Sequence, residues 1–333
     1  MTGATSPVPR RRRPDAPTHA RPPRRPGVRP GRGPRAGRDP ARGSCGRHRL
    51  VRRRRHGPRR PARPARRAGR RGALADGARY VALGDSYSAA SGVLPPDPTA
   101  PPQCLRSTLN YPHLIAERTG ARLVDVTCGG AETGDYAEGQ YPGVAPQLDA
   151  LNRRTRLVTM TIGGNDSGVF IGSILSCGAL GVLSLGQGSP CKDQFGSSYE
   201  DTIRDTTYPA IVKVLRQVAR RAPRAEVAIL GYPWILPRAG GCFDQMPVAE
   251  GDVPYLRSLQ ATLNDAVRRA AAATGSTYVN LNRVSEGHDA CQEVGVRWIE
   301  PVLQGTNPVI VHPNALGEAR MAARAVRVLD LVP

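Results

Sequence analysis

The pentapeptide Gly84-Asp85-Ser86-Tyr87-Ser88 directly follows the apolar run Tyr80-Val81-Ala82-Leu83. A short, continuous apolar run is typical of a strand that is buried on both faces of a parallel sheet. Open α/β sheets place their chemistry at the carboxyl ends of such strands, where the Gly turn presents Ser86. We therefore predict that Ser86 is a nucleophile, which requires a base nearby to remove its proton.

Four further runs of apolar and β-branched residues alternate with amphipathic helical patterns. This alternation predicts a doubly wound parallel sheet. Two stretches interrupt it: residues 167–206, which are apolar and rich in Gly and Ser, and residues 232–252. We interpret the first as a functional insertion near the site, since it is too long for a plain loop. The expected strands are 79–83, 122–127, 156–162, 225–230 and 277–281, and the expected helices are 111–119, 208–222, 254–273 and 313–330.

Three histidines beyond residue 75 are candidates for the base. His312 follows the strand-like Val309-Ile310-Val311 and opens the last predicted helix, which can return it to the carboxyl edge of the sheet. With an ordinary pKa near 6.5, an imidazole suits proton transfer at neutral pH. His113 lies within a short amphipathic helix and is interpreted as a packing or surface residue. His288, in an irregular segment beside Cys291, is the rival base.

Oxyanion donors are predicted on the turns that follow the second and third strands. Asn165 follows the pair Gly163-Gly164, and its side-chain amide donates without carrying charge. Gly129 and Gly130 follow the second strand, where the lack of a side chain allows a backbone N–H to approach a substrate closely. Asp85 and Asp166 are interpreted mainly as acceptors that hold their own turns.

The basic character of the chain is confined to its first part. Residues 1–72 hold 25 Arg, no Lys and two Asp, a charge of +23, whereas the remainder has 23 Lys and Arg against 25 Asp and Glu. With so few apolar residues, we expect 1–75 to be a disordered leader, a wrongly assigned start or a processed secretory region. Ala73-Leu74-Ala75 has the form of a cleavage site, but no apolar core precedes it. We expect residues 76–333 to be the folded domain and not to bind nucleic acid.

Six of the seven cysteines lie in this domain and none forms a Cys-x-x-Cys pair. An even number of dispersed cysteines favours three disulfides in an exported protein over a zinc site, with buried free thiols as the alternative. Six cysteines allow 15 pairings, of which we choose nearest neighbours. The chosen pairs are Cys104 with Cys128, Cys177 with Cys191, and Cys242 with Cys291. We expect no membrane-spanning segment, because no run of 18 apolar residues is present.

Four blocks together resemble the SGNH (GDSL) hydrolase family over nearly all of residues 78–330: the Gly84-Asp85-Ser86 turn, Cys128-Gly129-Gly130-Ala131, Gly163-Gly164-Asn165-Asp166, and His312-Pro313-Asn314. The chain looks most similar to secreted actinobacterial esterases and lipases with three disulfides. The resemblance implies a three-layer α/β/α sandwich with a five-stranded parallel, flavodoxin-like sheet. It also implies the roles of nucleophile for Ser86, base for His312, and oxyanion donors for Ser86, Gly130 and Asn165.

One departure from that family concerns the group that orients the base. Many members carry Asp three residues before the histidine, where this chain has Val309. We therefore expect a main-chain carbonyl to accept from His312 Nδ1, with Val309 as the first choice and Ile310 as the second. A carboxylate from elsewhere, Asp289 or Glu300, is the alternative.

The expected function is that of a secreted serine ester hydrolase, an esterase or lipase that acts on a small-molecule or lipid ester. We expect a monomer with no metal and no cofactor. A carbohydrate acetyl-esterase of the same fold is the first alternative. A polyanion-binding protein that uses the Arg-rich arm is the second, and a catalytically inactive binding module of the same fold is the third.

Overall fold

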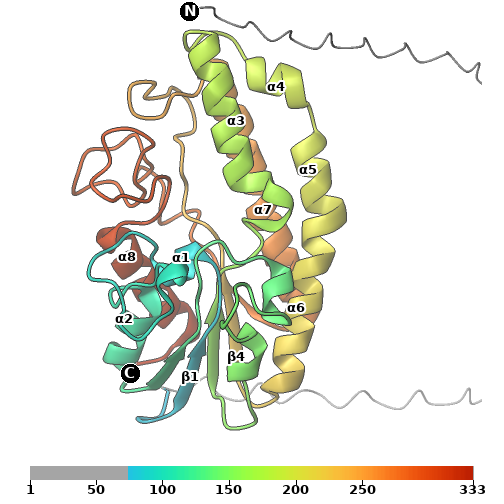
Figure 1. Ribbon diagram of the computed structural model, residues 1–333, viewed down its shortest axis with the longest axis vertical. Coiled ribbons are helices and arrows are strands. Elements are labelled where there is room, and N and C mark those ends of the chain that lie inside the picture. Colours follow the sequence, from blue (N-terminus) through green and yellow to red (C-terminus); the bar gives the residue numbers. More distant parts are fainter. Residues whose placement is uncertain (1–73, 333) are drawn as a thin grey trace, which may run out of the picture. The chain divides into compact units, whose positions relative to one another are not determined.

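The computed structural model describes residues 74–332 (Figure 1). The predictions made for the Arg-rich arm concern residues 1–73, which lie outside the described residues. Beyond that arm, the chain folds around a central sheet whose first strand carries the Ser86 turn at its carboxyl end.

Five strands form one parallel sheet in the order β2-β1-β3-β4-β5. All five predicted strands are present, and β1 lies between β2 and β3, with Val81 opposite Val124 on one side and Val158 on the other. The chain reverses its direction of travel across the sheet at β1, which is where open α/β sheets bind ligands. The strands are β1 Arg79–Ala82, β2 Arg122–Asp125, β3 Leu157–Met160, β4 Glu226–Leu230 and β5 Thr277–Val279.

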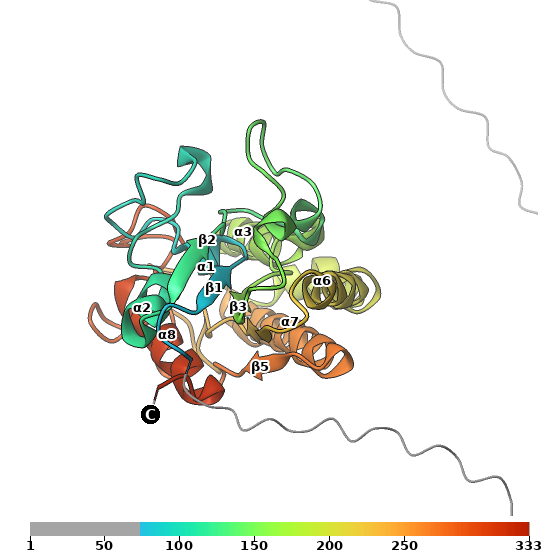
Figure 2. The same ribbon diagram turned by 90° about the horizontal axis from the view of Figure 1, so that it is seen from below.

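Helices cover both faces of the sheet, as the predicted three-layer sandwich requires (Figure 2). Helices α2 (Tyr111–Thr119) and α8 (Ala315–Leu329) pack on one face, where Tyr80 and Ala82 of β1 point. Helices α6 (Tyr208–Arg221) and α7 (Val253–Thr274) pack on the other, against Val81. Because successive strand residues point to opposite faces, one apolar run supplies both cores.

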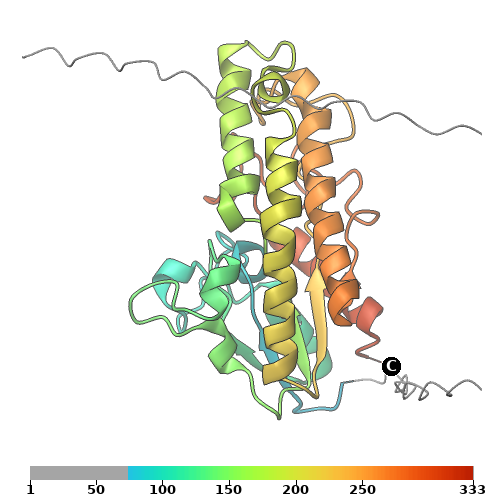
Figure 3. The ribbon, with the colours of Figure 1, turned by 90° about the vertical axis from the view of Figure 1, so that its right-hand side faces the viewer.

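The insertion at 167–206 is helical, although its Gly and Ser content is typical of a loop. It consists of η4 (Asp166–Gly168), α3 (Val169–Leu183), α4 (Pro190–Phe195), α5 (Ser198–Thr202) and the π-helical turn η5 (Ile203–Thr207). Figure 3 shows α3 beside α7, beyond the end of the sheet. Gly181 lets α3 approach the segment that precedes α7, because a Cβ at that position would collide with the carbonyl oxygen of Pro247.

The stretch Asp166–Leu183 is, among residues 74–332, the one segment long and apolar enough to cross a membrane by length and composition. Its inner face packs in a core through Phe170, Ile174 and Cys177. Core helices of globular proteins meet the same criterion, so the segment is weak evidence for a membrane span. The sequence predicted no membrane-spanning segment, and the described residues add this single candidate by length and composition.

Three disulfides join Cys104 to Cys128, Cys177 to Cys191, and Cys242 to Cys291. These are the nearest-neighbour pairs chosen from the sequence. The first ties the turn after β2 to the loop after β1, and the second ties α3 to α4. The remaining short elements are α1 Ser86–Ala89, η1 Pro102–Cys104, η2 Thr133–Tyr136, η3 Gln147–Ala150 and η6 Glu250–Asp252.

Candidate active site

Ser86 begins α1 immediately after the turn that ends β1. Asp85 caps this helix by accepting a hydrogen bond from the Tyr87 N–H at 3.0 Å. Gly84 has a φ of 134°, and a side chain there would lie 2.8 Å from the Thr161 carbonyl oxygen and collide with Ser88. The turn therefore requires Gly at 84, and it leaves Ser86 7% exposed at the carboxyl edge of the sheet.

Ser88 explains why the chain lacks the second Gly of the common hydrolase elbow. Its hydroxyl lies 2.8 Å from the hydroxyls of Tyr111 and Thr161, and it accepts from the Thr161 N–H at 2.9 Å. The residue is completely buried. Ser88 thus joins the turn after β1 to the end of β3.

The turn after β2 presents Gly130 beside that strand end. Cys128 N–H donates to the Gly84 carbonyl at 3.1 Å, and Gly129 N–H donates to the Cys104 carbonyl at 2.8 Å. Gly130 has a φ of 77°, and within the described residues no acceptor takes its N–H. A free N–H on an anchored turn is what an oxyanion donor needs.

Asn165 follows the Gly163-Gly164 turn after β3, as predicted. Its Nδ2 donates to the Ala131 carbonyl at 3.0 Å, so the amide lies next to the Gly130 turn. Asp166, the next residue, accepts hydrogen bonds from the backbone N–H and the hydroxyl of Thr133. The turns after β2 and β3 are therefore joined by two sets of hydrogen bonds.

His312 reaches the same edge of the sheet from the loop before α8. Its ring centroid lies 5.2 Å from that of Tyr87, the residue after Ser86, and the Tyr87 hydroxyl donates to the Val311 carbonyl at 2.7 Å. No hydrogen bond joins the Ser86 hydroxyl to the imidazole among residues 74–332. Tyr87, which is not among the residues predicted for the site, provides the contact between the two loops.

The carbonyl that faces His312 Nδ1 is that of Ile310, at 2.7 Å. The first choice, Val309, is wrong. Val311 has a φ of 60°, and this left-handed turn folds the chain back so that the ring reaches the carbonyl two residues before it. Neither alternative carboxylate is bonded to His312. Glu300 is paired with Arg297, and Asp289 accepts from Cys291 N–H and Gln292.

Burial lowers the pKa of His312 below its usual value, and the hydrogen bond to the Ile310 carbonyl opposes part of that shift. The imidazole is therefore neutral at neutral pH. With Nδ1–H donated to Ile310, Nε2 carries the free lone pair that a general base requires.

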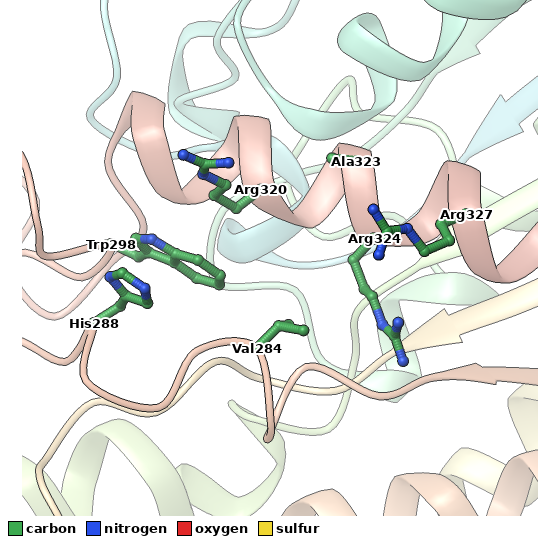
Figure 4. Close-up of a pocket in the computed structure, with 7 residues that line it drawn as sticks. All are labelled: Val284, His288, Trp298, Arg320, Ala323, Arg324 and Arg327. Carbon is green, nitrogen blue, oxygen red and sulfur yellow. The ribbon is translucent and has the colours of Figure 1, made fainter.

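The other two histidines lie elsewhere. His113 contacts Asn110, which caps α2, and Asp125 at the end of β2. His288 stacks on Trp298 with ring centroids 4.6 Å apart, at one end of a cavity of about 380 Å³ that is shown in Figure 4. Three arginines of α8 line this cavity together with Ala323, Val284, His288 and Trp298, and no serine does. Neither histidine therefore meets a candidate nucleophile.

A buried tyrosine after β4 was also missed from the sequence. The Tyr232 hydroxyl donates to Asp85 Oδ2 at 2.6 Å and accepts from the Gly164 N–H at 3.0 Å. A Gly followed by a polar residue at the end of a strand is the signal that identified Ser86 and Asn165. Gly231-Tyr232 carries that signal too, although Tyr232 begins the stretch 232–252 that interrupts the strand and helix pattern. Among residues 74–332, no group of three or more His, Cys, Asp or Glu is arranged to hold a metal ion.

Comparison with known proteins identifies the family. Residues 82–320 match the GDSL-like Lipase/Acylhydrolase family. The chain belongs to this family. Lipase 2 of Streptomyces coelicolor is 63% identical over 254 residues, which cover 76% of this chain and 86% of that protein. A lipase of Streptomyces rimosus is 33% identical over 72% of this chain and 82% of its own length.

Two solved structures agree with this family and with the fold. The phospholipase A1 from Streptomyces albidoflavus has a TM-score of 0.62 at 29% identity, over 76% of this chain and 98% of its own. The extracellular lipase from Streptomyces rimosus also has a TM-score of 0.62, at 32% identity and the same coverage. The GDSL protein described here is thus a carboxylic ester hydrolase of the lipase and esterase kind, with the predicted α/β/α fold.

Proposed function

We propose that this GDSL enzyme hydrolyses esters through a Ser86–His312 dyad and a covalent acyl-enzyme. The observation that supports this most is that hydrogen bonds and ring contacts connect the four predicted blocks at one edge of the sheet. Asn165 bonds to the turn that carries Gly130, and Tyr87 bonds to the loop that carries His312. The residue types in that group are a hydroxyl, an imidazole and amide donors, which are the parts of an acyl-transfer site.

In the first step, Ser86 Oγ attacks the ester carbonyl carbon while His312 Nε2 takes the hydroxyl proton. The carbonyl oxygen becomes an oxyanion that accepts from the N–H groups of Ser86 and Gly130 and from Asn165 Nδ2. The C–O bond to the alcohol then breaks, and His312 returns the proton to the departing oxygen. The acyl group remains bound to Ser86 as an ester.

In the second step, water takes the place of the serine hydroxyl. His312 removes a proton from the water, whose oxygen attacks the acyl carbon through a second oxyanion held by the same donors. The bond to Ser86 breaks, His312 protonates Oγ, and the carboxylic acid departs. The Ile310 carbonyl would hold the ring in the tautomer that both steps require. As a neutral acceptor, it would stabilise the imidazolium less than a carboxylate does.

We propose that the substrate carries a long acyl chain. The apolar helix α3 begins four residues after Asn165, and Phe170 in its first turn packs 5.8 Å from Tyr232, measured between ring centroids. The far end of the helix exposes Leu183 and neighbouring Leu185, 80% and 81% respectively. Leu175 and Val182 are exposed as well, so a lipid ester would find apolar surface from the middle of this helix to its far end. Relatives described as lipases and a phospholipase A1 agree with that substrate class.

We propose that the folded part works outside the cytoplasm. Its three disulfides persist in oxidising compartments, and the Streptomyces rimosus relative is described as an extracellular lipase.

Ser86→Ala and a series of p-nitrophenyl esters test the proposal together. Loss of the nucleophile lowers turnover on the order of 10⁶-fold in serine hydrolases, so we expect no measurable ester turnover from Ser86→Ala. Ser91→Ala is the matched control, since the Ser91 hydroxyl is buried in the same segment without a partner. It should retain the activity of the unmodified enzyme. Near-normal turnover by Ser86→Ala would reject the mechanism.

The same ester series distinguishes the substrate classes. We expect the highest kcat/KM on octanoate or longer esters. A maximum at acetate would instead favour the carbohydrate acetyl-esterase alternative, because a deacetylase needs only a small acyl pocket.

A further inference from the structure

Tyr232 is a buried residue that contacts two of the proposed catalytic turns through one oxygen atom. It follows β4 and is 1% exposed. Its hydroxyl donates to Asp85 Oδ2 at 2.6 Å and accepts from the Gly164 N–H at 3.0 Å. Asp85 immediately precedes Ser86, and Gly164 immediately precedes Asn165. The oxygen therefore bridges the turn of the nucleophile and the turn of the amide donor.

The ring of Tyr232 extends this connection to the loop of the base. It packs edge to face on Tyr87 with centroids 5.0 Å apart. Tyr87 in turn lies against His312 and donates to the Val311 carbonyl. One side chain thus touches, directly or through one neighbour, the elements that carry Ser86, Asn165 and His312.

The backbone of Tyr232 is held independently of its hydroxyl. Its N–H donates to Asn264 Oδ1 at 2.8 Å, and its carbonyl accepts from Asn264 Nδ2 at 2.9 Å and from Gln260 of the same helix, α7. Loss of the hydroxyl therefore leaves the ring in place. The carboxylate of Asp85 and the N–H of Gly164 would then each lose one hydrogen-bond partner.

Burial raises the pKa of Tyr232 well above its usual value, and the negative charge of Asp85 adds to the shift. The hydroxyl accordingly stays protonated and remains a donor to the carboxylate. Asp85 Oδ1 has two further donors, the Thr161 hydroxyl at 2.6 Å and the Tyr87 N–H. Loss of the Tyr232 hydroxyl would therefore loosen the Ser86 turn without releasing it.

We propose that Tyr232 is a positioning residue that sets the relation of Ser86 to Asn165 and so places the oxyanion donor opposite the nucleophile. This inference rests on the proposed function. Tyr232 does not touch the substrate in this scheme. It acts through Asp85 and Gly164, and its effect should be expressed in the transition state, where a small displacement of a donor is costly.

Tyr232→Phe in the full chain tests the inference. Kinetics on p-nitrophenyl octanoate should show kcat reduced by about tenfold and KM changed by less than about twofold, because only transition-state contacts weaken. Tyr136→Phe is the matched control, since Tyr136 is equally buried and its hydroxyl has no partner among the described residues. It should keep the wild-type kcat. Thermal unfolding of both variants shows up to which temperature each remains folded, and the kinetics are measured below that temperature.

A double-mutant cycle separates positioning from a general structural role. If Tyr232 acts by positioning Asn165, Tyr232→Phe should cost much less in an Asn165→Ala background than in the wild type. An equal loss in both backgrounds, or a wild-type kcat for Tyr232→Phe, would overturn the inference. Ser86→Ala serves as the reference. If it is inactive while Tyr232→Phe is normal, only this inference fails. If Ser86→Ala keeps its activity, the proposed mechanism fails and the inference falls with it.

Discussion

At the scale of single residues, the site depends on short contacts between neighbours in the chain. Gly84 gives the turn a φ that side chains avoid, Asp85 caps the helix that begins with Ser86, and Ile310 accepts from the ring two residues later. Each of these is a local arrangement. The motif Gly84-Asp85-Ser86 could therefore be interpreted from the sequence before any coordinate was known.

The pKa of His312 leads to a prediction for the pH profile. Burial lowers that pKa, and the base must be neutral to accept a proton, so activity should persist to a lower pH than an ordinary imidazole allows. We expect the acid limb of kcat/KM to fall below about pH 6.5. Measuring kcat/KM between about pH 4 and about pH 8 locates this acid limb. His288→Gln is the control and should leave the limb unchanged.

Two results would contradict this prediction. An acid limb with its midpoint clearly above about pH 6.5 would mean that the pKa of His312 is not lowered by burial. A limb that moves in His288→Gln would transfer the role of base to the rival histidine.

At the scale of elements, helices α2 and α8 share a buried carboxyl group. Glu318, in the first turn of α8, is completely buried, and its Oε2 accepts from the Tyr111 N–H at 2.7 Å. Its Oε1 has no partner in the described part of the chain. Burial raises the pKa of Glu318 well above its usual value, and the charges of Asp125 and Asp85 add to the shift. The group is thus held in its neutral form between the two helices.

The stability of Glu318→Gln relative to the wild type should increase as the pH rises. Because the folded-state pKa of Glu318 is raised, the unfolded chain releases this proton above about pH 4.3 while the folded chain keeps it. The wild type then loses up to about 1.4 kcal/mol of stability per pH unit until the folded-state pKa is reached. Glutamine keeps an acceptor for Tyr111 but does not titrate. Melting temperatures of the two proteins should diverge between about pH 5 and about pH 8.

The matched control for that experiment is Glu117→Gln, at an exposed position of α2. This variant should follow the wild type at every pH. A constant difference between Glu318→Gln and the wild type across the range would show that the carboxyl group does not titrate differently in the folded and unfolded states.

At the scale of the whole molecule, the excess positive charge and the described fold belong to different parts of the sequence. Residues 74–332 form their own cores and close on themselves where the Leu74 N–H donates to the Leu331 carbonyl at 3.0 Å. The excess positive charge belongs to residues 1–72. The proposed chemistry uses no residue of that arm.

A chain that starts at Leu74 should therefore fold and hydrolyse esters like the full chain. We expect kcat/KM within about twofold and an unchanged melting temperature, because no core or site residue is removed. Measuring the binding of labelled heparin to the full chain and to the shortened chain tests whether the Arg-rich arm binds polyanions. Loss of ester turnover on truncation would contradict the prediction. Tight heparin binding by the full chain alone would support the polyanion-binding role.

The number of strands, their parallel arrangement and the main helices followed from the sequence, because periodicity along the chain reflects which faces are buried. The insertion was harder to predict. The sequence indicated an insertion too long for a plain loop but did not predict its helices, and Gly181 lies inside α3, where a neighbouring backbone leaves no room for a side chain. That requirement comes from Pro247, a residue far away in the sequence. A pattern within α3 could not reveal it.

Local motifs identified Ser86, Asn165 and His312 as candidates, since each depends on a strand end, a turn and a residue type that are adjacent in the chain. The motif after β2 left Gly129 and Gly130 together, and the resemblance to the SGNH family selected Gly130. Only the folded structure selected Ile310 over Val309 and revealed Tyr87 and Tyr232. Tyr87 meets Val311 across 224 residues of sequence, and Tyr232 meets Asp85 across 147. Contacts at such separations depend on how the whole sheet and its loops pack, and a single sequence carries no periodic signal for them.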